Sequence, residues 1–277
     1  MDASQRDKAR AFHALHERPG AFVIPNPYDA GTARILAGFG FEALATTSAG
    51  CAFGLGRRDG AISRDDALTH ARSIALATPL PVSADLENGY ADAPDGVALT
   101  VRLAAEAGLC GCSIEDASGR PAQPIYDLAH AVERIAAAVE AARRLPFPFT
   151  LTARAENFLH GRPDLDDTIR RLQAFEAAGA DVLYAPGLRE AAAIRTVCAA
   201  LSKPVNVIMG LAGAAFSVEQ LAALGVRRIS LGSALARAAL GEFLRAAAEV
   251  GQRGTFAFAE RAASFEQIER FMVPPPA

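Results

Sequence analysis

The feature that most constrains the fold is a junction that recurs four times along the chain. At each junction a helical pattern ends at glycine and an apolar strand pattern follows at once. Glycine suits these positions because helix ends often adopt a left-handed backbone conformation that other residues avoid. Helices that lead repeatedly into buried strands require parallel strands joined by right-handed crossovers. The junctions are Ala37–Phe41, Ala107–Leu109, Ala178–Ala180 and Leu224–Val226.

Short apolar runs and amphipathic runs alternate along most of the chain, which predicts eight strands with helices between them. Strands are predicted over 21–26, 41–46, 81–84, 111–114, 149–153, 181–184, 205–208 and 226–231. Helices are predicted over 5–16, 30–37, 63–77, 95–107, 127–144, 164–178, 189–201 and 217–224. Eight such units in this length predict a (β/α)₈ TIM barrel. A doubly wound open sheet is the alternative, but no G-x-G-x-x-G follows the first strand.

The remaining segment predicts an addition to the barrel rather than a second domain. A long Ala-rich helix is predicted over 233–250, a glycine break over 251–254, and one more helix over 256–271 before a proline tail. We therefore expect a single barrel domain over 1–277, with 255–277 as a C-terminal helical extension. This extension could pad its own barrel or dock on another subunit.

Composition excludes several classes of protein. Half of the 277 residues are apolar, which is ample for a large core, and the formal net charge is −3 without a basic stripe. We therefore expect neither nucleic-acid nor membrane partners. The polar opening residues do not resemble a secretory signal. The cysteines are predicted to be buried free thiols, which indicates a cytoplasmic protein; they are Cys51, Cys110, Cys112 and Cys198.

Acidic residues follow two neighbouring strands at their carboxyl ends. Asp85 and Glu87 lie two residues apart after the third strand, and Glu115 follows the fourth. Residues i and i+2 of a strand share a face, so these carboxylates would repel one another unless a cation lies between them. A hard divalent ion takes such oxygen ligands. The pattern indicates an Mg²⁺ site, although chance acids in a solvated loop give the same residues.

Candidate anion binders flank these acids. Arg154 ends the fifth strand and offers a planar fork suited to a carboxylate or phosphonate. Thr47, Ser48 and the amides after them follow the second strand and supply further donors. Asn206 lies in the seventh strand, either as a substrate contact or as a satisfied core amide. Together these residues indicate a metal-assisted enzyme that acts on a small-molecule carboxylate.

Over about residues 22–241 the chain resembles the isocitrate lyase and phosphoenolpyruvate mutase superfamily. Five motifs, in order and at barrel-like spacing, carry the resemblance. They are Thr47-Ser48-Ala49, Leu55-Gly56-Arg57-Arg58-Asp59, Asp85-x-Glu87-x-Gly89-Tyr90, Ile114-Glu115-Asp116 and Thr152-Ala153-Arg154.

The resemblance implies a set of site residues. It implies Mg²⁺, with Mn²⁺ as a substitute, held by Asp85, Glu87 and Glu115 directly or through water. It implies that Asp59, Glu115 and Arg154 take part in catalysis, while an enolate is stabilised as a C–C or P–C bond breaks. Substrate contacts are expected from Thr47, Ser48, Ala49, Asn88, Gly89, Arg154 and Asn206. It also implies a homo-oligomer, either a tetramer or a dimer, that exchanges its last helix between subunits.

One departure from the superfamily bears on the substrate. Isocitrate and methylisocitrate lyases carry a Lys-x-Cys-Gly-His loop after the fourth strand, whereas 117–124 here reads Ala-Ser-Gly-Arg-Pro-Ala-Gln-Pro. The hypothesis is therefore a lyase that cleaves a C–C bond of a small 2-oxo or 2-hydroxy di- or tricarboxylic acid, as in oxaloacetate decarboxylation. P–C chemistry on phosphonopyruvate, as a mutase or hydrolase, is the second hypothesis. An inactive carboxylate-binding barrel and an ordinary phosphate-binding barrel are the others.

Overall fold

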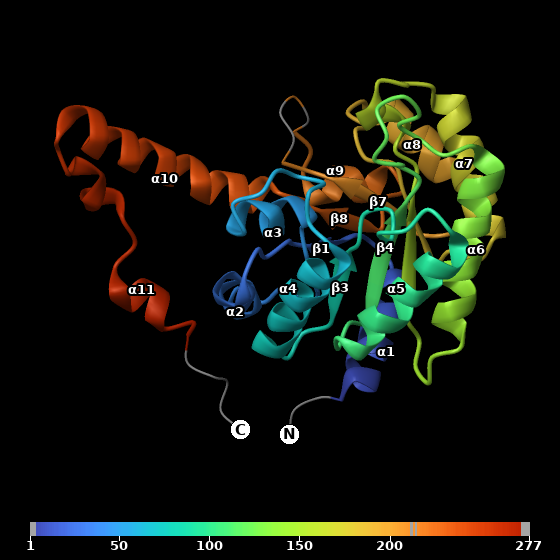
Figure 1. Cartoon of the computed structure of the whole chain (residues 1–277), viewed down its shortest axis with the longest axis horizontal. Helices are drawn as coiled ribbons and strands as arrows, with labels where there is room; N and C mark the ends of the chain where they lie inside the picture. Colours follow the sequence, from blue (N-terminus) through green and yellow to red (C-terminus); the bar gives the residue numbers. More distant parts are fainter. Residues whose placement is uncertain (1–3, 211–212, 214, 273–277) are drawn as a thin grey trace.

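The computed structural model describes residues 4–210, 213 and 215–272. Within them, eight short strands alternate with helices, as the glycine junctions predict (Figure 1). The strands are β1 (Phe22–Ile24), β2 (Leu44–Ala45), β3 (Val82–Asp85), β4 (Gly111–Glu115), β5 (Thr150–Arg154), β6 (Val182–Tyr184), β7 (Val205–Ile208) and β8 (Arg228–Ser230).

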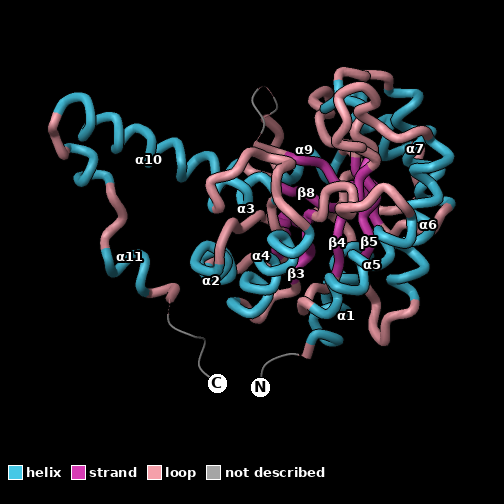
Figure 2. The backbone as a smooth tube through the Cα atoms, in the orientation of Figure 1, coloured by secondary structure: helices cyan, strands magenta, loops and turns pink. Residues whose placement is uncertain are grey.

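The helices surround the strands and extend beyond them (Figure 2). Those that accompany the barrel are α1 (Gln5–Glu17), α2 (Ala30–Gly38), α3 (Ser48–Gly54), α4 (Arg64–Ala77), α5 (Pro94–Glu106), α6 (Leu128–Arg143), α7 (Leu165–Ala177), α8 (Ala191–Ala199) and α9 (Val218–Ala223), with a 3₁₀ turn η1 (Asn157–His160). The extension consists of α10 (Ala234–Arg253), η2 (Ala257–Arg261) and α11 (Phe265–Glu269). No helix in the described part of the chain is long and apolar enough to cross a membrane.

The strands close into a barrel. All neighbouring pairs are parallel, in the order β1-β8-β7-β6-β5-β4-β3-β2. The two ends of this order meet where the amide of Ala45 donates to the carbonyl of Pro25 at 3.0 Å. This arrangement confirms the predicted (β/α)₈ barrel. At the predicted junctions, Gly179 and Gly225 have φ values of 101° and 98°, the left-handed conformation that favours glycine.

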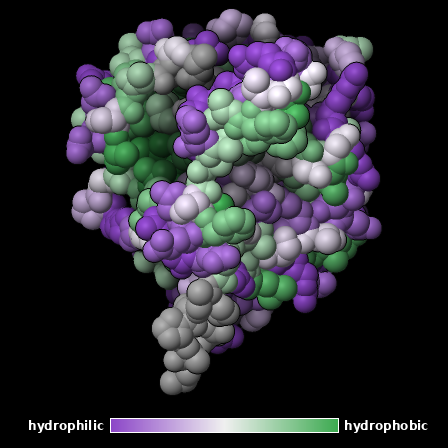
Figure 3. Space-filling model, turned by 90° about the vertical axis from the view of Figure 1, so that its left-hand side faces the viewer, coloured by the Kyte–Doolittle hydropathy of each residue, from purple (hydrophilic) through white to green (hydrophobic). Residues whose placement is uncertain are grey.

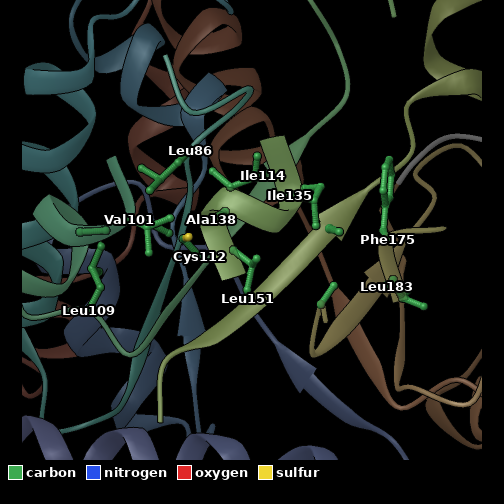
Figure 4. Packing of buried hydrophobic residues seen from close by; sticks show 14 of the residues in the cluster. Leu86, Val101, Leu109, Cys112, Ile114, Ile135, Ala138, Leu151, Phe175 and Leu183 are labelled. Carbon is green, nitrogen blue, oxygen red and sulfur yellow. The ribbon is translucent and has the colours of Figure 1, made fainter. Parts of the chain in front are cut away.

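Strand alternation separates an apolar outer core from a polar interior. Residues on one face, such as Ile114 and Leu151, pack against Val101 of α5 and Ile135 of α6 (Figure 4). The other face of the same strands is largely polar, which is unusual for a region so well shielded from bulk water. These interior side chains include Ser83, Ser113, Thr152, Asn206 and Arg228. These polar side chains inside the barrel could bind a polar ligand, so the barrel interior is a candidate location for a functional site.

Two local predictions differ from the structure after the second strand. The strand predicted over 41–46 is reduced to Leu44–Ala45, and Ser48–Gly54 forms helix α3 where a loop was expected. Thr47 caps this helix, since its Oγ1 accepts a hydrogen bond from the amide of Gly50 at 3.2 Å. The small residues of α3 show too little apolar periodicity for sequence reasoning to detect a helix.

The C-terminal extension also differs in detail. Helix α10 continues through most of the predicted glycine break and ends at Arg253, where Gly254 caps it with a φ of 64°. The single helix predicted over 256–271 is instead η2 and α11, because Ser264 begins a new helix with a capping box. The predicted proline tail lies outside the described residues.

The extension leaves the barrel as an arm and returns toward α2 (Figure 1). Its end is held by Arg34, whose Nη1 donates to the carbonyl of Met272 at 2.6 Å, and by Phe271, which stacks on Phe39. Apolar and polar patches alternate on the face viewed from the arm's side (Figure 3). Exchange of this segment between subunits stays a prediction. The most exposed large apolar side chains on the arm are Phe243, Leu244, Phe256 and Phe265.

Candidate active site

A cavity of about 220 Å³ opens at the carboxyl ends of the strands. This is the end of a (β/α)₈ barrel where active sites lie. The structure brings most of the sequence-predicted residues to its wall. Those that line it are Thr47, Ser48, Ala49, Asp59, Asp85, Arg154 and Asn206.

Arg154 is the centre of the site. Its Nη1 donates to Asp85 Oδ1 at 2.7 Å, its Nη2 lies 3.0 Å from Glu115 Oε2, and its Nε donates to Glu156 Oε1 at 2.9 Å. The register of the parallel strands produces this arrangement, because Glu115 of β4 pairs with Arg154 of β5. Burial alone would lower the pKa of Arg154, but the three carboxylates raise it well above its ordinary value.

The other oxygen of Asp85 is held from the second strand's side. Asp85 Oδ2 accepts hydrogen bonds from the Ser48 amide at 3.2 Å and from the Ser48 hydroxyl at 2.8 Å. The Asp85 amide donates to Thr46 Oγ1 at 3.0 Å. Ser48 thus binds Asp85, one of the predicted metal ligands. It also lines the cavity in which a substrate would lie.

Glu87 is a strained and incompletely satisfied acid beside this cluster. Its φ is 46°, a left-handed conformation that is uncommon for a residue with a side chain. Its Oε1 is buried without a hydrogen-bond partner among the described residues. Burial, together with the charges of Asp85 and Asp59, raises the pKa of Glu87 to about 7. A buried oxygen left unpaired in this way requires an explanation, and a bound ion or water would provide one.

Asn88 and Gly89 do not reach the cavity. Asn88 Oδ1 accepts from the amide of Tyr90 at 3.0 Å, and the carbonyl of Gly89 accepts from Thr100 Oγ1 at 2.6 Å. Gly89 has a φ of 76°, so a side chain there would strain the turn. Both residues shape the loop that carries Glu87, and the structure does not place them where they would touch a substrate.

The acids are not arranged as direct ligands of one ion. In the part of the chain that the structure describes, no three His, Cys, Asp or Glu side chains converge closely enough to hold a metal. Nevertheless the carboxylates around the Arg154 guanidinium outnumber its single positive charge, so the cluster keeps an excess of negative charge. Burial and the neighbouring carboxylates raise the pKa values of Glu115 and Asp59. The donor set therefore fits Mg²⁺, which prefers oxygen ligands and usually keeps several waters. The carboxylates are Asp59, Asp85, Glu87, Glu115 and Glu156.

Sequence reasoning missed several residues of this site. Glu156 follows Arg154 by two residues, so the same i, i+2 rule that paired Asp85 with Glu87 could have found it. Arg228 and Ser230 share the inward face of β8 and line the cavity, as does Tyr184 of β6. Two consecutive arginines, Arg227 and Arg228, look in sequence like a pair of solvent-exposed charges. This pattern therefore contains no sign that Arg228 is buried.

The loop after β4 stays outside the cavity. It forms an antiparallel bridge between Ala117 and Ile125. Arg120 Nη1 lies 3.3 Å from Asp92 Oδ2, and the hydroxyl of Tyr126 donates to the same carboxylate. None of the residues 117–125 lines the cavity. The loop therefore supplies no acid or base to this conformation of the site.

Comparisons with known proteins agree with the geometry. Residues 12–251 match the family model described as phosphoenolpyruvate phosphomutase. An oxaloacetate decarboxylase of Ectopseudomonas mendocina is 30% identical over 245 residues, which cover 86% of this chain and 82% of that protein. The crystal structure of a putative lyase/mutase from Burkholderia cenocepacia is 62% identical, with a TM-score of 0.95 over 98% of this chain and 97% of that one. Oxaloacetate acetylhydrolase with its product oxalate is 26% identical, with a TM-score of 0.86 over 98% and 95% of the two chains.

Proposed function

Since the chain belongs to the phosphoenolpyruvate mutase family, within a superfamily of lyases and mutases, we propose that it is an Mg²⁺-dependent carbon–carbon lyase. Its substrate would be a small 2-oxo or 2-hydroxy acid with more than one carboxylate. The reaction would pass through an enolate, as in decarboxylation of an oxaloacetate-like acid. Similarity to an oxaloacetate decarboxylase supports this substrate class.

The observation that carries the proposal is the contact of Arg154 with Asp85 at the cavity wall. The guanidinium and the Ser48 amide and hydroxyl fix Asp85 from two sides, at 2.7, 3.2 and 2.8 Å. Groups held this firmly before substrate arrives do not need to reorganise during the reaction, which is the main source of electrostatic catalysis. Arg154 also lines the cavity, so once a cation offsets the surrounding carboxylates its guanidinium would stabilise the negative charge that forms on the substrate.

Asp85, Glu87 and Glu115 would hold the ion, directly or through water. When bound by these residues, Mg²⁺ would supply a Lewis acid for a carbonyl oxygen of the substrate. The unpaired buried oxygen of Glu87 supports this assignment, because a cation would satisfy it. Ser48 and Arg154 orient Asp85 toward the cavity in the absence of the ion as well.

Decarboxylation suits this site better than cleavage that needs a protein acid. When CO₂ leaves a 2-oxo acid with a 3-carboxylate, the bonding electron pair stays on the carbon beside the carbonyl as an enolate. Water can then supply the proton to that carbon. The loop 117–125 offers neither a cysteine nor a histidine and lies outside the cavity.

Oxalate, a planar mimic of the enolate of pyruvate, is expected to raise the melting temperature only when Mg²⁺ is present. A ligand that binds the folded state alone stabilises it by mass action, by about 2.7 kcal/mol at 100 times its Kd. The measurement is a thermal-shift titration with oxalate, with and without Mg²⁺, and with acetate as the control acid. No shift under either condition would reject the enolate chemistry and favour an inactive carboxylate-binding barrel.

A second candidate is P–C chemistry on phosphonopyruvate, and the position of Asp59 favours it. Asp59 lines the cavity, and burial with the charge of Asp85 raises its pKa, as expected for a group beside a reacting bond. Turnover of oxaloacetate and 2-hydroxy diacids should be compared with turnover of phosphonopyruvate under the same conditions. We expect at least about tenfold higher kcat/KM on the carboxylic acids, equal to about 1.4 kcal/mol of transition-state preference. The reverse order would establish the second candidate.

A further inference from the structure

A second cation, Arg228, lies on the floor of the same cavity. It begins β8, is 5% exposed, and lines the cavity wall. Its Nε donates to Asn206 Oδ1 at 2.9 Å, and its Nη2 donates to Thr152 Oγ1 at 2.9 Å. Its Nη1 lies 3.4 Å from Nε2 of His16. The side chain is thus fixed by three neighbours on three different elements.

None of these neighbours neutralises its charge. Asn206 and Thr152 are neutral, and burial together with Arg228 itself lowers the pKa of His16 to about 3. Among residues 4–210, 213 and 215–272, no carboxylate forms an ion pair with Arg228. By contrast, the buried Arg171 pairs with two carboxylates, those of Asp116 and Asp167.

Arg228 nevertheless carries its charge at neutral pH. Burial lowers its pKa from 12.5 to about 10, which still leaves the guanidinium protonated. A buried charge without a counter-ion is costly, and proteins usually pair it with an acid or a ligand. Three of its donor groups have partners, and a guanidinium has five N–H groups, so N–H groups remain for an anion.

The two arginines lie at different depths of one cavity. Thr152 precedes Arg154 by two residues on β5 and shares its inward face, so Arg228 contacts the layer below Arg154. Arg154 at the mouth pairs with three carboxylates, whereas Arg228 at the floor pairs with none in the described part of the chain. An anion that reaches the floor would therefore meet an uncompensated cation.

We propose that Arg228 binds a second carboxylate of the substrate, so that the cavity selects dicarboxylic acids whose reacting end lies at Asp85 and Arg154. The planar guanidinium fork suits a carboxylate, and burial strengthens the contact. This inference rests on the proposed function for the placement of the reacting end. The competing role, in which Arg228 only offsets the acids at the mouth, would affect the binding of every anion equally.

Matched ligands separate the two roles. Malate and 2-hydroxybutyrate differ only in a carboxylate that replaces a methyl group. Binding of both acids in the presence of Mg²⁺ is measured by calorimetry for the wild-type protein, Arg228→Met and Arg228→Lys. The same measurements are made with the pair that is one methylene longer, 2-hydroxyglutarate and 2-hydroxypentanoate. We expect wild type to bind a diacid at least about tenfold more tightly than its partner, as for a charge-assisted hydrogen bond. Arg228→Met should remove this preference and leave the monoacid within twofold, while Arg228→Lys should keep part of it.

Several outcomes would overturn the inference. If the wild-type protein binds the diacid and the monoacid equally tightly in both pairs, the inference is wrong. This outcome needs no variant, so it can be observed even if Arg228→Met does not fold. Equal loss of both ligands in Arg228→Met would assign a purely electrostatic role. If 3-phosphonolactate binds more tightly than malate with the same dependence on Arg228, the second group is a phosphonate. Failure of oxalate to bind with Mg²⁺ rejects the proposed function alone, because the diacid preference is measured separately.

Discussion

Replacing Arg154 with methionine is expected to lower the free energy of unfolding by about 3–5 kcal/mol and to reduce kcat/KM by at least about 100-fold. The side chain is only 13% exposed and pairs with Asp85, Glu115 and Glu156, so its loss leaves three buried acids facing one another. Denaturant unfolding gives the first quantity and turnover of the best diacid gives the second. The loss of stability should shrink as pH falls, because Glu115, whose pKa is raised by burial, takes up a proton and the repulsion weakens.

Arg144→Met is the matched control for this change. Arg144 also pairs with a carboxylate, that of Glu140, but its side chain is 75% exposed at the C-terminal cap of α6. Exposed helical pairs contribute about 0.3–0.5 kcal/mol, so stability and activity should hardly change. A similar small effect for Arg154→Met would mean that water screens the Arg154 cluster and that the acids do not depend on it.

Asp85→Asn is expected to weaken Mg²⁺ binding roughly 100-fold or more and to reduce kcat/KM by about 10²–10³. The substitution keeps the shape of the side chain but removes the charge that lines the cavity. It also places an amide beside the Arg154 guanidinium, which Asp85 Oδ1 now contacts at 2.7 Å. Calorimetric titration of Mg²⁺ and steady-state kinetics at saturating metal measure the two effects.

Asp95→Asn provides the comparison for Asp85→Asn. Asp95 is an exposed acid in the first turn of α5, away from the cavity lining. Its removal costs a few tenths of a kcal/mol at most through the helix dipole and should leave Mg²⁺ affinity unchanged. If Asp85→Asn keeps full Mg²⁺ affinity, the ion is held elsewhere and the assignment of Asp85 is wrong.

The barrel could be predicted from the sequence because its signals are local. Glycine after each of several helices, and apolar runs of strand length, are visible within a dozen residues, as at Gly179 and Gly225. The same locality made Asp85, Glu115 and Arg154 predictable, since each ends a strand and parallel strands end at one side of a barrel. Asn88 and Gly89 fit the same rule in sequence, but the left-handed turn at 87–90 directs them into the loop.

Other features depended on contacts that no local pattern contains. Sequence determined that acids and one arginine gather at the strand ends. Only the tertiary structure decided that Arg154 pairs with three of them and that Ser48 holds Asp85. It also decided that Arg228 is buried in the interior without an ion pair to any acid of the described residues. The physical reason is that strand periodicity fixes which face a side chain takes, whereas the register between strands and the burial of each charge fix its partners. Those quantities arise only when the sheet closes.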